Sequence, residues 1–114
     1  MPAVIPLVLL TLATSAQPAS VALEVRGPGG CPGQPWVAAR LSQLLQRPAV
    51  DPGSARAARL RVIPEGAGLV ATVRLDGGER VLRTATRDCP ALLDAATLAL
   101  AVALDPIRGL ALQA

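Results

Sequence analysis

Residues 69–86, LVATVRLDGGERVLRTAT, carry the clearest fold signal in the chain. The first seven alternate in hydropathy, which is typical of a half-buried strand. One face of this strand is apolar: Leu69, Ala71, Val73 and Leu75. Residues 76–79 predict a tight turn, because glycine adopts positive φ without steric cost. Residues 80–86 return as a second strand, whose two faces stay unassigned because the apolar residues Val81 and Leu82 are adjacent.

Alternation predicts two more strands upstream of this hairpin, over 21–26 and 59–63. In 59–63 the apolar side chains of Leu60 and Val62 point inward, and the intervening arginines point outward. Together with the hairpin, the strand over 59–63 forms a three-stranded meander.

Two helices are predicted, over 35–46 and 91–105. The second is apolar on every side except at Asp94 and Thr97, and Asp88 is placed to cap its start. A helix of this length spans ~22 Å, less than the ~30 Å of a bilayer core. We therefore expect it to pack against a sheet or a partner.

The predicted element order is β-α-β-β-β-α. This order indicates an α+β fold, with an antiparallel sheet and both helices packed on one of its faces. We expect a single domain over 17–106, followed by a short C-terminal tail over 107–114 that is free to pair, pack or fray.

Residues 1–16 predict a secretory signal peptide. They contain no charged side chain, and an apolar run over 3–12 is followed by small and polar residues, the pattern of an export signal. Thr14 and Ala16 supply the small side chains that precede a cut before Gln17. We therefore expect a periplasmic or secreted location and, after cleavage, no transmembrane span.

Cys31 and Cys89 are the only cysteines in the chain. In an oxidising compartment an isolated pair most often forms a structural disulfide. The sequence has no C-x-x-C pattern, and two thiolates without histidine do not complete a four-ligand zinc site. We predict a Cys31–Cys89 bridge that joins the starts of the two helices. A reactive thiol at either position is the alternative.

The residue types that the sequence lacks exclude several kinds of catalytic and metal site. The chain has no His, Lys, Tyr or Phe and one Trp, so its 11 basic residues are all arginine. Histidine-dependent nucleophilic catalysis, imidazole metal sites and Schiff-base chemistry are therefore excluded. We expect no catalytic residue, no cofactor and no metal. Because almost no aromatic side chain is available to stack on bases, we expect no nucleic-acid partner.

The candidate functional residues are arginines of the meander. Alternation places Arg59 and Arg61 on one face, and pairing of the strands brings Arg74 to the same face, with either Arg80 or Arg83. We take Arg83 as the fourth member of a candidate anion-binding set, because clustered guanidinium groups bind phosphates and carboxylates. The alternative is a solvated outer face of a one-sided sheet.

The chain resembles a type of small exported domain of unknown function found in GC-rich Gram-negative bacteria of the fruiting, predatory kind. The residues that carry the resemblance are Cys31, the segments GLVATVRL (68–75) and ERVLR (79–83), and CPALLDAA (89–96) running on to Asp105-Pro106. The resemblance implies an exported module that precedes another segment, often a membrane-associated one. It implies no catalytic residue.

These observations favour a non-enzymatic interaction or accessory module of the periplasm or envelope, held by one disulfide and contacting an envelope protein through a sheet face or edge. Two other functions are consistent with the sequence: a secreted thiol-redox or hydrolase accessory, and a peripheral binder that attaches to anionic envelope surfaces through its arginines.

Overall fold

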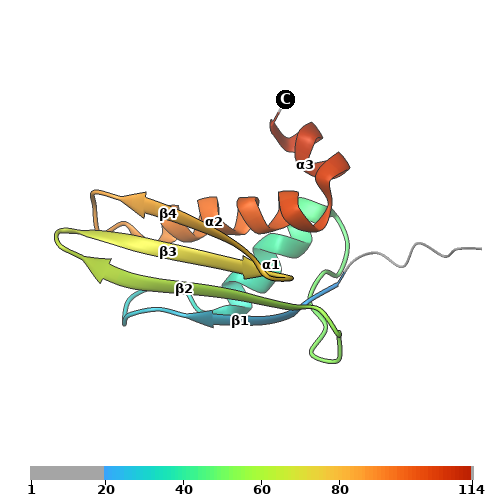
Figure 1. The fold of residues 1–114 in the computed structure, drawn as a ribbon, viewed down its shortest axis with the longest axis horizontal. Helices are drawn as coiled ribbons and strands as arrows, with labels where there is room; N and C mark the ends of the chain where they lie inside the picture. The colour runs from blue at the N-terminus through green and yellow to red at the C-terminus, as the bar shows by residue number, and fades with distance from the viewer. Residues whose placement is uncertain (1–19, 114) are drawn as a thin grey trace, which may run out of the picture.

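The computed structural model describes residues 20–113 and has two layers, a four-stranded sheet and helices that cover one of its faces (Figure 1). In chain order the elements are β1 (Ala22–Arg26), α1 (Gln34–Leu45), β2 (Ala57–Glu65), β3 (Gly68–Leu75), β4 (Gly78–Thr84), α2 (Cys89–Leu104) and α3 (Pro106–Gln113). The predicted α+β class and element order are confirmed up to α2. The signal peptide predicted over 1–16 lies outside the described residues.

The sheet has the strand order β1-β2-β3-β4 and is mostly antiparallel. The exception is that β1 and β2 run parallel, with Leu23 beside Ala58 and Val25 beside Leu60. The expectation of a wholly antiparallel sheet is wrong for this pair. Since α1 carries the chain back along the sheet, β2 starts at the same end as β1, as in other strand–helix–strand units.

The hairpin between β3 and β4 turns more tightly than predicted. Asp76 and Gly77 both have positive φ, of 50° and 80°, and Leu75 pairs directly with Gly78. This is the two-residue turn whose twist matches that of the strands it joins. As a result β4 begins at Gly78, two residues earlier than expected, and the turn fixes the faces that the sequence left open: Leu82 points toward the helices and Val81 away from them.

The core lies between the sheet and the two long helices. α1 packs against β1 and α2, and α2 packs against β3 and β4. The buried side chains are aliphatic, and the largest fully buried apolar ones are Leu41, Leu60, Leu93, Leu100, Val21 and Val37. Small alanines on α2, such as Ala96 and Ala101, are also fully buried and allow the helix to approach its neighbours closely.

The polar residues of α2 have local partners. Asp88 caps the helix as predicted, with its Oδ1 accepting a hydrogen bond of 3.1 Å from the Ala91 amide. The buried Thr97 hydroxyl donates to the Leu93 carbonyl at 2.6 Å, so it adds no unsatisfied group to the core. Asp94 forms a 2.7 Å ion pair with Arg40 of α1. Within residues 20–113 no helix is long and apolar enough to cross a membrane.

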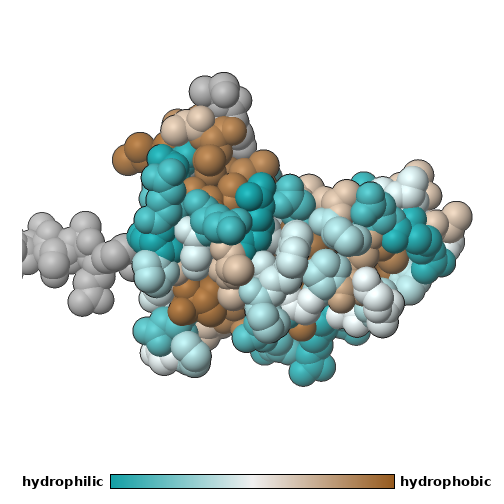
Figure 2. Space-filling model, turned by 180° about the vertical axis from the view of Figure 1, so that it is seen from behind, coloured by the Kyte–Doolittle hydropathy of each residue, from teal (hydrophilic) through white to brown (hydrophobic). Residues whose placement is uncertain are grey.

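The tail that the sequence left open is helical. α3 begins after Asp105, whose Oδ1 accepts a hydrogen bond of 3.0 Å from the Arg108 amide. Gly109 faces α2 so closely that a Cβ at this position would lie 2.8 Å from Val102. The opposite side of α3 is open, with Ile107 84% and Leu110 70% exposed, and Figure 2 shows the apolar surface that gathers over this helix.

Candidate anion-binding face

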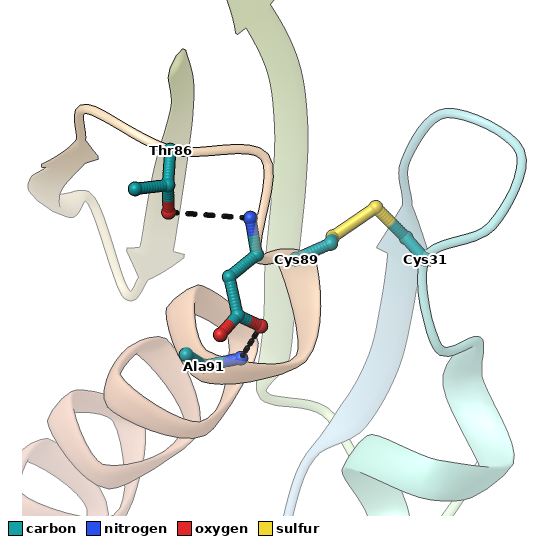
Figure 3. The surroundings of a disulfide bond; sticks show 5 residues. Cys31, Thr86, Cys89 and Ala91 are labelled. Atoms are coloured by element: carbon teal, nitrogen blue, oxygen red, sulfur yellow. Dashed lines mark hydrogen bonds between the residues drawn. A yellow bond between two sulfur atoms is a disulfide. The ribbon is translucent and has the colours of Figure 1, made fainter.

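The predicted disulfide is present. Cys31, in the loop before α1, is bonded to Cys89, the first residue of α2, with the two Cα atoms 5.3 Å apart (Figure 3). Both cysteines therefore lie at the end of the molecule where the two long helices start, and the bridge ties α2 to the loop that leads into α1. Because the chain has two cysteines, neither thiol is free. Cys89 is also buried, at 4% exposure.

The face of the sheet that points away from the helices carries five arginines, which we call the arginine face: Arg26, Arg59, Arg61, Arg74 and Arg83. All four arginines of the predicted set belong to it. The alternative fourth member, Arg80, pairs with the inward-pointing Val73 and therefore belongs to the opposite face.

Strand register arranges the charged side chains in rows that cross the sheet. One row runs through all four strands as Glu24, Arg59, Arg74 and Glu79. The next contains Arg26, Arg61, Thr72 and Val81. Three of the predicted arginines, Arg59, Arg61 and Arg74, are thus direct or diagonal neighbours. Arg83 lies farther along the sheet, opposite Val70.

Arg26 was not among the predicted site residues. Its outward orientation follows from the alternation over 21–26, but its position beside Arg61 depends on the parallel pairing of β1 with β2. An alternating pattern shows on which face of the sheet a side chain lies, but not which strand lies beside it. The sequence therefore indicated the face of Arg26 but not its position next to Arg61.

Glutamates neutralise part of the arginine face. Glu24 contacts Arg26 at 2.6 Å and Arg59 at 3.4 Å. Arg74 pairs with Glu79 at 3.2 Å, and Arg83 with Glu65 at 3.4 Å. Five arginines against three glutamates leave this face with two excess positive charges.

Arg61 has no carboxylate partner among the described residues, and it lines a hollow of about 220 Å³ together with Arg59, Thr72, Arg74 and Glu79. A second hollow, of about 320 Å³, adjoins it and is lined by Glu24, Arg26, Arg59, Leu60 and Arg61. Guanidinium groups and a threonine hydroxyl are hydrogen-bond donors suited to a phosphate or carboxylate. Arg59 and Arg61 line both hollows, so an anion held there would contact the least neutralised part of the face.

The carboxylates of the chain are already engaged. Five form ion pairs with arginine: Glu24, Glu65, Asp76, Glu79 and Asp94. Three accept hydrogen bonds from backbone amides in turns or helix starts: Asp51, Asp88 and Asp105. These eight are all the acidic residues of the sequence. In the part of the chain that the structure describes, no three His, Cys, Asp or Glu side chains gather where they would hold a metal ion.

The chain matches no family model, no curated protein and no solved structure.

Proposed function

We propose that this chain is an exported, non-enzymatic binding module that attaches to an anionic group of an envelope partner through its arginine face. The observation that carries the proposal is the grouping of Arg59, Arg61 and Arg74 around one hollow, with Arg61 free of any carboxylate partner in residues 20–113. An oxyanion placed there gains charge-assisted hydrogen bonds from more than one guanidinium group.

The internal ion pairs on this face do not oppose binding. The arginine side chains that form them are 62–76% exposed. Exposed pairs of this kind contribute ~0–1 kcal/mol, so exchanging an internal carboxylate for an external anion costs little. The face is also dispensable for the core, because its side chains point away from the helices. Its charge is therefore available for recognition.

A binding role is also supported by what the other polar groups do. Each carboxylate is engaged in an ion pair, a turn or a helix cap, and the chain contains no histidine or lysine that would serve as a general base. Both thiols form the disulfide, which weighs against the thiol-redox alternative. Labelling of the folded protein with a thiol reagent tests that alternative, since one readily alkylated cysteine would favour it.

Export is supported by the disulfide, since such bonds persist in oxidising compartments and are rare in the cytosol. The intact mass of the protein recovered from its native compartment tests this part of the proposal. We expect removal of the residues before Gln17 and the loss of two hydrogens that accompanies the bridge. A full-length, reduced chain would contradict export.

The binding proposal is tested with two anionic probes, poly-L-glutamate and vesicles that contain phosphatidylglycerol, with phosphatidylcholine vesicles as the neutral reference. We expect binding that weakens as salt is raised, because exposed charges are screened. Binding to poly-L-glutamate alone indicates an acidic protein partner, and binding to the anionic vesicles alone indicates a peripheral binder of envelope lipid.

Arg61→Ala is the informative variant, and Arg80→Ala is its matched control. Both side chains are exposed and without a carboxylate partner among the described residues, but Arg80 lies on the opposite face. We expect Arg61→Ala to weaken binding about fivefold, as for the loss of one exposed charge contact, and Arg80→Ala to leave it unchanged. Equal effects of the two variants would show that net charge, and not this face, attracts the probe.

A further inference from the structure

The sheet ends in an open strand, β4. This strand pairs with β3 on one side and has no neighbour on the other among the described residues. It is seven residues long, contains no proline and pairs with β3 without a bulge. Edge strands of this kind present a row of unpaired backbone groups, which natural proteins commonly cover or shorten.

The turn determines which backbone groups of β4 are free. A two-residue turn closes on a hydrogen-bonded pair, here Leu75 with Gly78, and such pairs then alternate with non-bonded ones along the ladder. Gly78, Arg80, Leu82 and Thr84 therefore bond to β3. The N–H and C=O groups of Glu79, Val81 and Arg83 point to the open side.

These three residues form a self-complementary set. If two β4 strands pair antiparallel about a two-fold axis at Val81, each Glu79 lies opposite Arg83 of the second copy, and the two Val81 residues lie opposite each other. All the backbone groups that point outward then meet one another in the same register. The side chains fit as well, because opposite charges and apolar side chains stabilise cross-strand pairs. Val81 is 44% exposed in the single chain, which leaves its apolar surface available for such a contact.

The exposed helix lies on the same side of the molecule. α3 rises from the end of α2 on the side of the sheet where β4 is the outermost strand (Figure 1). Its exposed apolar side chains, Ile107 and Leu110, have no cover in residues 20–113. A second copy paired along β4 would occupy this side.

The opposite edge of the sheet, β1, is less suitable for pairing with a second copy. β1 has five residues. If two β1 strands paired antiparallel with Glu24 opposite Arg26, only three residues of each strand would overlap. The register at β4 overlaps all seven residues of the strand.

We propose that the partner of the β4 edge is a second copy of this chain, in a two-fold dimer that extends the sheet to eight strands with Val81 at the axis. The dimer places two arginine faces side by side on one continuous sheet surface. The dimer does not depend on anion binding. Its test therefore measures the molecular mass in solution and needs no ligand.

The experiment measures the mass of the oxidised, exported chain by sedimentation over a range of concentrations. We expect the unmodified protein to be dimeric and two single variants, Glu79→Arg and Arg83→Glu, to dissociate at least about tenfold more readily, because each sets like charges opposite each other in both symmetry-related pairs. An equimolar mixture of the two variants restores opposite charges at every pair, so we expect it to form a heterodimer.

A proline variant gives a second, independent readout. The Val81 N–H faces away from β3, so Val81→Pro removes no hydrogen bond of the single chain but removes the central ones of the dimer. We expect a folded, oxidised monomer, whereas Val81→Thr, which keeps the N–H, stays dimeric. The proposal is overturned if the unmodified chain is monomeric up to its solubility limit. It is also overturned if the charge variants associate as well alone as they do in the mixture.

Discussion

The two faces of the sheet are built from alternate residues of the same strands but have opposite properties. On the inner face Leu60 and Val62 are 1% and 3% exposed and contribute to the core. Between them on the outer face, Arg61 is exposed and has no carboxylate partner among the described residues. The inner face thus determines the fold, while the outer face determines what the surface offers to a partner. Residues next to each other in sequence are therefore expected to give very different results when substituted.

The largest expected effect concerns the bond that fastens the helix layer over the inner face. Replacing both Cys31 and Cys89 by serine opens a loop with a sequence separation of 58 residues. The loop-entropy relation assigns a loss of about 4 kcal/mol in the free energy of unfolding to this change. Urea unfolding of the variant and of the reduced unmodified chain measures it, and the two are expected to agree. Unchanged stability on reduction would contradict a structural role for the bridge.

The next largest effect is expected within the inner face. Leu60→Ala removes a fully buried side chain and leaves a cavity, with an expected loss of roughly 3 kcal/mol. The midpoint of urea unfolding reports it, if the slope of the transition is unchanged. A loss below about 1 kcal/mol would mean that the core collapses around the truncation and is less tightly packed than these burials indicate.

A smaller effect is expected where α2 begins. Asp88→Ala removes the acceptor for the Ala91 amide, with an expected loss of about 1 kcal/mol. Asp88→Asn keeps an acceptor oxygen at the same position and serves as the control, with a change of only a few tenths of a kcal/mol expected. Thermal unfolding of both variants measures these losses. Equal losses would show that the charge of Asp88 matters more than its capping hydrogen bond.

The smallest effect is expected on the outer face. Arg61→Ala changes an exposed side chain away from the core, and its free energy of unfolding is expected to stay within about 0.5 kcal/mol of the unmodified value. The same urea titration that reports Leu60→Ala measures it, one residue away in the same strand. A large loss would show that Arg61 stabilises the fold. Weaker binding by Arg61→Ala could then result from loss of structure, and Arg80→Ala would no longer be a matched control.

Alternation in the sequence predicted most of the fold, because the side-chain period of a strand is a local property. It placed Leu60, Val62 and the apolar face of the first hairpin strand correctly, but it left the faces of the returning strand unassigned. The Asp88 cap and the disulfide pairing were also predicted. It did not give the direction of β1, because period-2 alternation is the same in parallel and antiparallel pairs. The formation of α3 was missed as well, since Gly109 lowers helix propensity and is explained only by its close approach to Val102.

Four of the five arginines of the candidate site were predicted, but Arg26 and the charge balance of the face were not. Alternation correctly set Arg59 and Arg61 on one face, and the expected pairing of the strands added Arg74. The ion pair between Glu24 and Arg59, however, joins residues that are far apart in sequence. Such pairs follow from strand register, which depends on the tertiary structure. Whether Arg61 has a partner could therefore be decided only from the fold.

The position of the disulfide has a consequence for proteolysis. The loop between α1 and β2 lies inside the segment that the bridge closes, and Asp51, Pro52, Gly53 and Ala55 on it are exposed. Exposed loop tips are preferred sites of proteolytic nicking. A single cut there would leave two fragments that stay covalently attached, one carrying β1 and α1 and the other the remaining strands, α2 and α3. A nicked molecule would keep its two halves together under oxidising conditions and would separate into them only in the presence of a reductant.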